Sequence, residues 1–179
     1  MGLKYPTKAE GSGPPVDPQR TPKAMQVRFG FPARADRPPV TLHWYHAANG
    51  PEILAKHNLP AKGNNNLFIG SKGMLLCGFG GRQLLPKEKF ADVPAPEPFI
   101  PDSPGFHQEF VQACKGGPPA TCAFDYSGPL AETVILGNVA YRAGGFDWDA
   151  KTLTTTAANP AAKQLIREEY RKGWSLGLS

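Results

Sequence analysis

The chain has 179 residues, a formal net charge of +5 at pH 7 and a hydrophobic fraction of 40%. Its 20 glycines and 20 prolines stay below the share typical of a disordered low-complexity chain, so the composition predicts one loop-rich globular domain. No apolar run approaches the roughly 18 residues that span a bilayer, and the basic residues are scattered among acidic ones. We therefore expect neither a membrane segment nor a nucleic-acid partner.

The first clear strands come after an N-terminal segment, residues 1–21, that is mostly a loop rich in glycine and proline. Residues 25–31 and 40–46 alternate apolar and polar side chains with period two, which is typical of half-buried strands. The short turn between them predicts a hairpin. Its second strand places on one face Val40, Leu42 and Trp44, and on the other Thr41, His43 and Tyr45.

A second hairpin is predicted from residues 66–69 and 74–77, and residues 82–85 add a short strand. Gly70 and Gly73 bound the turn of this hairpin. We expect both glycines to adopt the positive φ angles that tight turns require.

The proline-punctuated residues 86–102 are expected to be irregular and to separate these strands from three helices. We predict helices from Ser103 to Gly116, from Ser127 to Ala143 and from Asn159 to Lys172. Each begins at a capping residue with a proline close behind it and ends at glycine. The second helix is apolar nearly all round, which predicts burial between two layers. The inner face of the third is expected to consist of Leu165, Ile166 and Tyr170.

Strands mainly in residues 5–85 followed by helices mainly in residues 103–174 predict an α+β fold. We expect a single two-layer domain over residues 1–179, in which an open-faced antiparallel or mixed sheet carries helices on one face. The uncovered face of that sheet is expected to expose apolar area, and such a patch predicts self-association.

Two glycine-rich segments, residues 70–73 and 78–81, superficially resemble phosphate-binding loops. A dinucleotide fingerprint needs G-x-G-x-x-G between a strand and a helix, and a Walker loop needs Ser or Thr after its lysine. No helix start follows Gly81, and Lys72 is followed by glycine. Both segments are therefore predicted to be turns, and no cofactor-binding residue is assigned.

No catalytic and no metal-ligating residue is assigned either. The histidines have no evident Ser or Cys partner, and His43 and His46 are three apart on one strand, so they face opposite sides. The polar and aromatic face around Thr41 suits a carbohydrate ligand or a packed interface equally well. The candidate substrate-pocket residues are His43, Tyr45, His46, His57 and Arg142. For Arg142, which lies one turn after Asn138, a helix cap or a salt bridge to the sheet is the structural alternative.

The three cysteines, Cys77, Cys114 and Cys122, are an odd number without a C-x-x-C pair. The short loop between Cys114 and Cys122 permits a disulfide in an oxidising compartment. Reduced and buried thiols are the expected state.

Several segments together resemble one known family. Residues 68–75 are similar to the I-G-(S/T)-x-G-x-L hairpin of Gfo/Idh/MocA-type oxidoreductases, the superfamily of glucose–fructose oxidoreductase and inositol dehydrogenase. Residues 106–117 resemble its F-x-x-A-x-x-G helix, and residues 130–142 resemble the helix that follows. The tail of the bacterial C-terminal subtype is matched by residues 147–149, 159–162 and 167–174. The resemblance covers nearly the whole chain, and the order and spacing of the segments carry it.

The resemblance implies a cofactor that this chain does not bind. The family pairs an N-terminal Rossmann domain, which binds NAD or NADP, with a C-terminal open-faced sheet domain that shapes the substrate pocket and often dimerises. Its catalytic lysine lies in an E-K-P motif and its histidine in a D-x-x-x-H motif, and neither motif occurs here. The chain is therefore expected to start beyond the catalytic helix, with its C-terminal domain truncated at the N-terminus and the Rossmann domain missing.

The leading hypothesis is the substrate-binding and oligomerisation part of an NAD(P)-dependent sugar or polyol oxidoreductase, inactive alone. The alternative is a non-catalytic binding or assembly module derived from that family, and a hydrolase or lyase that uses His43, His46 or His57 ranks third. The expected partners are a sugar or polyol substrate, the missing Rossmann domain, and a further copy of the chain that associates through the open sheet face. The compartment is left open between the cytoplasm and an exported location.

Overall fold

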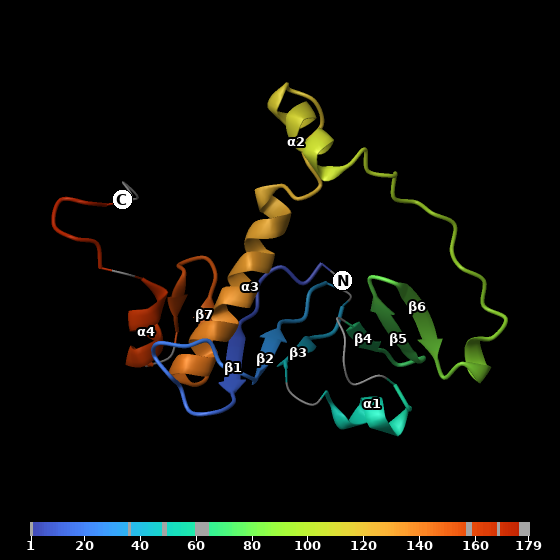
Figure 1. The fold of residues 1–179 in the computed structure, drawn as a ribbon, viewed down its shortest axis with the longest axis horizontal. Coiled ribbons are helices and arrows are strands. Elements are labelled where there is room, and N and C mark those ends of the chain that lie inside the picture. The colour runs from blue at the N-terminus through green and yellow to red at the C-terminus, as the bar shows by residue number, and fades with distance from the viewer. Residues whose placement is uncertain are drawn as a thin grey trace. The chain divides into compact units, whose positions relative to one another are not determined.

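The computed structural model describes residues 2–35, 37–47, 50–59, 65–156, 159–167 and 169–175 (Figure 1). These residues form eight strands in two antiparallel sheets and four α-helices, which confirms the α+β class. The chain divides into two compact units, one made of Met1–Ala48 with Phe110–Ser179 and the other of Asn49–Glu109. Each unit is described by itself.

The first unit is built on a five-stranded sheet with the order β3-β2-β1-β7-β8. Its strands are β1 Lys8–Ser12, β2 Met25–Phe31, β3 Val40–His46, β7 Phe146–Asp149 and β8 Thr154–Thr155. All neighbouring strands are antiparallel, and the predicted hairpin of β2 and β3 is confirmed, with Arg28 opposite His43. The central strand β1 was not recognised from the sequence, because its glycine and the loop that follows it obscure the alternation.

Helix α3, Phe124–Ala143, covers one face of this sheet and packs chiefly on β1 and β2. A Cβ atom at Gly11 of β1 would lie 2.4 Å from the backbone N of Tyr141, so this close crossing requires glycine. The indole Nε1 of Trp148 donates a hydrogen bond of 2.6 Å to the Glu132 carboxylate of α3. The core between the layers consists of Ala9, Val27, Phe29, Phe31, Leu136, Val139, Ala140, Phe146, Trp148 and Ala162.

Helix α3 differs from the prediction in its start and in its burial. It begins at Phe124 rather than Ser127, because the Ser127 N–H donates to the Ala123 carbonyl at 2.9 Å and continues the helical pattern upstream. Only one face of the helix is buried, so the expected all-round burial is wrong. The exposed face carries apolar side chains that are each more than half exposed, namely Leu130, Val134 and Ile135.

Helix α4, Pro160–Ile166, is shorter than predicted. The side chain of Asn159 accepts the Ala162 N–H at 3.0 Å, which confirms the predicted cap. The helix ends at Ile166 because Arg167 is extended, and the charged residues after it offer no apolar face to pack. Its buried residue is Ala162, whereas Leu165 and Tyr170 are exposed, so the predicted inner face is wrong for these two.

The second unit contains a three-stranded antiparallel sheet with the order β4-β5-β6. Its elements are α1 Glu52–Lys56, β4 Asn65–Ile69, β5 Met74–Gly78, β6 Gly81–Leu85 and the 3-10 turn Glu88–Phe90. The hairpin and the short strand predicted here are confirmed. The expected positive φ angles at Gly70 and Gly73 are wrong. Gly73 is instead needed for space, since a Cβ there would lie 2.6 Å from the Phe90 ring.

Helix α2, Phe106–Cys114, crosses from the second unit into the first. It starts later than predicted because Ser103 forms a local turn instead of an N-cap. The Ser103 hydroxyl accepts the Gly105 N–H at 3.0 Å and donates to the Glu109 carboxylate. Gly116 after the helix has a φ of 82°, which suits its predicted role as a terminator. None of the helices in the described part of the chain is long and apolar enough to cross a bilayer.

Candidate functional site

The two faces of the five-stranded sheet differ in chemistry because side chains alternate along each strand. The face turned to α3 carries the apolar core. The opposite face carries polar side chains, namely Lys8, Glu10, Ser12, Gln26, Arg28, Thr41, His43, Tyr45 and Asp147. The expectation of an apolar open face is therefore wrong, since the alternation sends the apolar residues of every strand to the helix layer.

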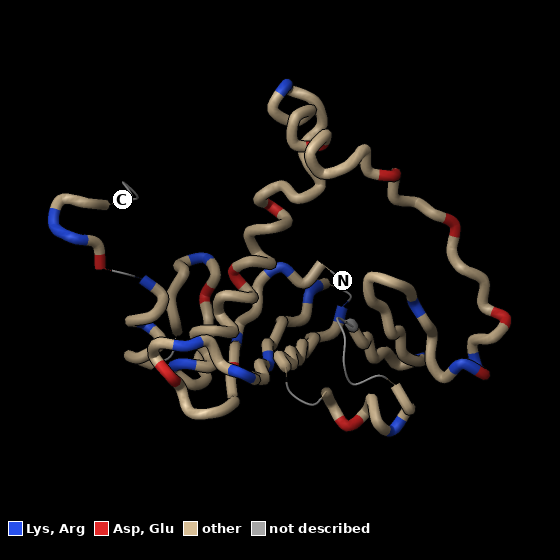
Figure 2. The backbone as a smooth tube through the Cα atoms, viewed as in Figure 1, with Lys and Arg blue, Asp and Glu red and all other residues tan. Residues whose placement is uncertain are grey.

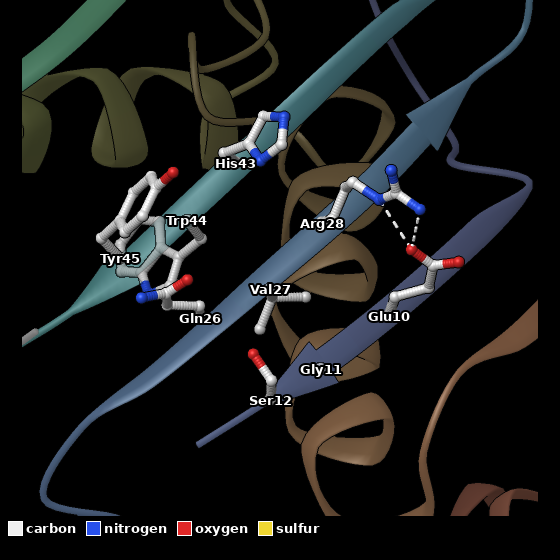
Figure 3. Close-up of a pocket in the computed structure, with 9 residues that line it drawn as sticks. All are labelled: Glu10, Gly11, Ser12, Gln26, Val27, Arg28, His43, Trp44 and Tyr45. Carbon is white, nitrogen blue, oxygen red and sulfur yellow. Dashed lines mark hydrogen bonds and ion pairs between the residues drawn. The ribbon is translucent and has the colours of Figure 1, made fainter. Parts of the chain in front are cut away.

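A pocket of about 320 Å³ lies on β1, β2 and β3 (Figure 3). It is lined by Glu10, Gly11, Ser12, Gln26, Val27, Arg28, His43, Trp44 and Tyr45. The strand register arranges its polar side chains in two rows across the three strands, the first Glu10, Arg28 and His43, the second Ser12, Gln26 and Tyr45. Neighbouring strands are about 4.8 Å apart and the two rows about 7 Å apart. This spacing places several donors and acceptors within reach of one small polar ligand.

The charged side chains of Lys8, Glu10 and Arg28 form a cluster in and beside the first row. Glu10 Oε1 lies 2.9 Å from Lys8 Nζ, and Glu10 Oε2 accepts from Arg28 Nε at 2.6 Å and from Arg28 Nη2. The hydrogen bond from Lys8, followed by that from Arg28, lowers the pKa of the Glu10 carboxyl. The same bond to Glu10 raises the pKa of Lys8. Glu10 therefore stays ionised and holds the guanidinium of Arg28 in place beside His43.

Aromatic rings form the β3 side of the pocket. The rings of His43 and Tyr45 are nearly parallel, with an interplanar angle of 20° and centroids 6.5 Å apart. Tyr45 is half-buried, whereas His43 is exposed. Such rings offer an apolar surface with a polar edge. The site therefore combines a fixed charged pair with flat aromatic surfaces, and it is open to solvent.

The structure separates the five predicted pocket residues. His43 and Tyr45 both line the pocket. His46 alternates onto the helix side of β3, and His57 lies at the end of α1 in the other unit. Arg142 belongs to α3 and donates to the Pro18 carbonyl at 3.5 Å, on the helix side of the sheet. These last three residues do not line the pocket.

The prediction missed four polar residues that line the pocket, namely Glu10, Ser12, Gln26 and Arg28. A signal for two of them was present in the sequence. The β2–β3 hairpin pairs Arg28 with His43 and Gln26 with Tyr45, so its register alone would have placed them in the same rows. Glu10 and Ser12 could not be found in this way, because β1 is joined to β2 through a long irregular loop.

The glycine-rich segments have the geometry of hairpin turns. Residues 70–73 connect β4 to β5, and residues 78–81 connect β5 to β6, so neither turn leads from a strand into a helix. The prediction that both are turns is confirmed. Within the described ranges, no three His, Cys, Asp or Glu side chains lie close enough to hold a metal ion.

The cysteines are free thiols among the described residues. Cys77 is half-buried, whereas Cys114 and Cys122 are exposed. The expectation of buried thiols is therefore wrong for the last two, because both lie in or beside the exposed α2 and its connection to α3. Lys and Arg are interspersed with Asp and Glu along the described chain, as Figure 2 shows.

No protein-family model matches the chain, and no curated protein sequence matches it. The function is therefore inferred from the residues and from the geometry of the site.

Proposed function

We propose that the first unit binds a sugar or polyol on the open face of its five-stranded sheet, as the substrate-side part of an NAD(P)-dependent oxidoreductase. One observation carries this proposal: the row Glu10, Arg28 and His43 lies beside Tyr45 in a pocket on the sheet face that the helices leave uncovered. The family resemblance in the sequence supplies the reaction class.

The chemistry of the pocket suits a polyhydroxylated ligand. Its volume of about 320 Å³ falls at the lower end of the range of small-molecule sites. Hydroxyl groups both donate and accept hydrogen bonds, and the pocket offers donors on Arg28 and Gln26 and an acceptor on Glu10. The ring of Tyr45 supports the apolar C–H surface of such a ligand.

The two glycine-rich turns do not have the geometry of a dinucleotide-binding loop. Both glycine-rich turns join antiparallel strands, so neither places backbone N–H groups at the start of a helix as a pyrophosphate requires. In this proposal another domain or chain supplies the nicotinamide.

A second candidate function is a binding module without catalysis. The observation that favours it is the mutual neutralisation of the charged groups, because Lys8 and Arg28 both engage Glu10 and leave no free carboxylate base in the row. The two functions share the same ligand site. They differ in whether a nicotinamide-binding partner joins the complex.

The test is calorimetric titration of the chain with a panel of monosaccharides and polyols. We expect binding that Arg28→Gln weakens at least tenfold, since a charge-assisted hydrogen bond contributes about 1.5–3 kcal/mol. The matched control is Arg20→Gln, which removes an exposed arginine that pairs only loosely with Asp17, at 3.7 Å. Sugar binding that Arg28→Gln leaves unchanged would refute the site. Tight binding of NAD by this chain alone would refute the proposal that another domain or chain supplies the nicotinamide.

A further inference from the structure

The two edges of the five-stranded sheet are unequal. At one edge β8 has only 2 residues, Thr154–Thr155. At the other edge β3 has 7 residues, and in the described part of the chain it pairs only with β2. A long edge strand presents a row of backbone N–H and C=O groups that another strand can pair with, whereas a very short one does not.

Strand β3 carries none of the features that usually block an edge. Its sequence, V-T-L-H-W-Y-H, has no Lys, Asp, Glu or Pro. It also has no bulge, since every residue from Val40 to His46 pairs in unbroken register with β2. The edge is therefore regular and free of charge along its whole length.

The helix layer leaves the β3 side of the sheet incompletely covered. Trp44 is 49% exposed, although Val27, its direct neighbour on β2, is only 3% exposed. Both side chains project towards the helix side. The difference arises because α3 packs chiefly on β1 and β2. Exposed apolar surface of Trp44 thus lies beside the open backbone edge of β3.

We propose that this edge pairs with β3 of a second copy of the chain, antiparallel and about a two-fold axis at His43. This register uses all 7 residues of the strand, because His43 is its centre. It places Leu42 opposite Trp44 of the second copy and Thr41 opposite Tyr45 of the second copy. On the helix side Leu42 thus meets Trp44, and Val40 meets His46 at the ends of the ladder, whereas polar residues meet on the open side.

Electrostatics do not oppose this pairing. The nearest fixed charges in the row are the two Arg28 side chains, which would be three strand spacings apart, about 14 Å. That distance exceeds the Debye length of about 8 Å at physiological ionic strength, and each Arg28 is already paired with Glu10. Because the β8 edge is too short to continue the ladder, the assembly closes at two copies instead of growing into fibres.

Cross-linking tests the register directly. In a background with the three native cysteines replaced by serine, we expect His43→Cys to form an intermolecular disulfide on mild oxidation, because the two-fold axis brings this position against itself. Thr41→Cys is the matched control, since its own copy would lie about 13 Å away along the strand. Equal cross-linking of the two variants, or of neither, would overturn the proposed pairing.

Light scattering tests the assembly without relying on cysteine chemistry. The full chain is expected to show about twice its monomer mass of 19.3 kDa across a concentration series in the micromolar range. Trp44→Lys is expected to shift it to the monomer, whereas Leu153→Lys, at a site that is 46% exposed beside β8, leaves the dimer intact. Circular dichroism verifies that both variants are folded. A monomeric parent chain, or a dimer that both substitutions affect alike, would refute the proposal, and neither result depends on sugar binding.

Discussion

A methyl group at position 11 tests how closely α3 lies on the sheet. A Cβ at Gly11 would be 2.4 Å from the backbone N of Tyr141 and 2.6 Å from the carbonyl carbon of Ala140. Ordinary contact begins near 3.4 Å, so Gly11→Ala requires the helix or β1 to move by about 1 Å. The obstructing atoms belong to the helix backbone and cannot rotate aside as a flexible side chain would.

The expected cost follows from this geometry. Extra methyl groups in well-packed cores typically cost about 1–3 kcal/mol, and an unyielding backbone neighbour places Gly11→Ala at the upper end. For a chain of 179 residues, about 3 kcal/mol corresponds to a fall in Tm of about 6–12 °C. The movement would also loosen Val139 and Ala140, which are buried between the layers.

Thermal unfolding followed by circular dichroism measures the effect. Gly30→Ala is the matched control, because it lies on the neighbouring strand and its Cβ would meet only the Cβ of Lys8, at 3.5 Å. We expect this control to change stability by less than about 1 kcal/mol, since glycine in a strand carries an entropic cost that alanine relieves. If Gly11→Ala has the same Tm as Gly30→Ala and the parent chain, the close crossing of α3 over β1 is wrong.

Two further predictions concern the cap of α4 and the charged row. Asn159→Ala removes the acceptor of the Ala162 N–H and the amide that donates to the carbonyls of Ala143 and Gly145. We therefore expect urea unfolding to show a free energy of unfolding lower by about 1–2 kcal/mol. Asn159→Asp keeps the cap but not the donating amide, so its stability should lie between those of the parent chain and Asn159→Ala. If Asn159→Asp lowers the free energy of unfolding as much as Asn159→Ala does, the cap contributes nothing to stability. The hydrogen bonds from Lys8 and Arg28 lower the pKa of the Glu10 carboxyl in the folded chain. The ionised carboxylate therefore stabilises the fold above its unfolded-state pKa near 4.5, and this stabilisation is lost as the pH falls through the lower folded-state pKa. Glu10→Gln should therefore flatten the acid limb of a stability–pH profile below about pH 5, and an unchanged slope would show that the cluster does not form.

Local sequence pattern was sufficient where neighbouring residues decide the structure. The β2–β3 hairpin, the β4–β5–β6 strands and the cap at Asn159 all follow from alternation, turn glycines and capping chemistry within a few residues. The same alternation identified His43 and Tyr45 as partners on one strand face. The pattern failed at helix ends. Helix α3 starts upstream of Ser127 through a local backbone hydrogen bond, and α4 ends where Arg167 becomes extended.

Two features were decided only by tertiary structure. The first is the central position of β1, which brings Glu10 beside Arg28 although the two are 18 residues apart in the sequence. The second is the assignment of sheet faces, since only the docking of α3 on β1 and β2 shows which set of alternating side chains is buried and which is open. The sequence by itself determined the β2–β3 hairpin, the strands β4, β5 and β6 and the α+β class, because those depend on short-range periodicity and turn chemistry. The polar pocket and the open β3 edge depend on contacts between distant segments, which no local pattern records.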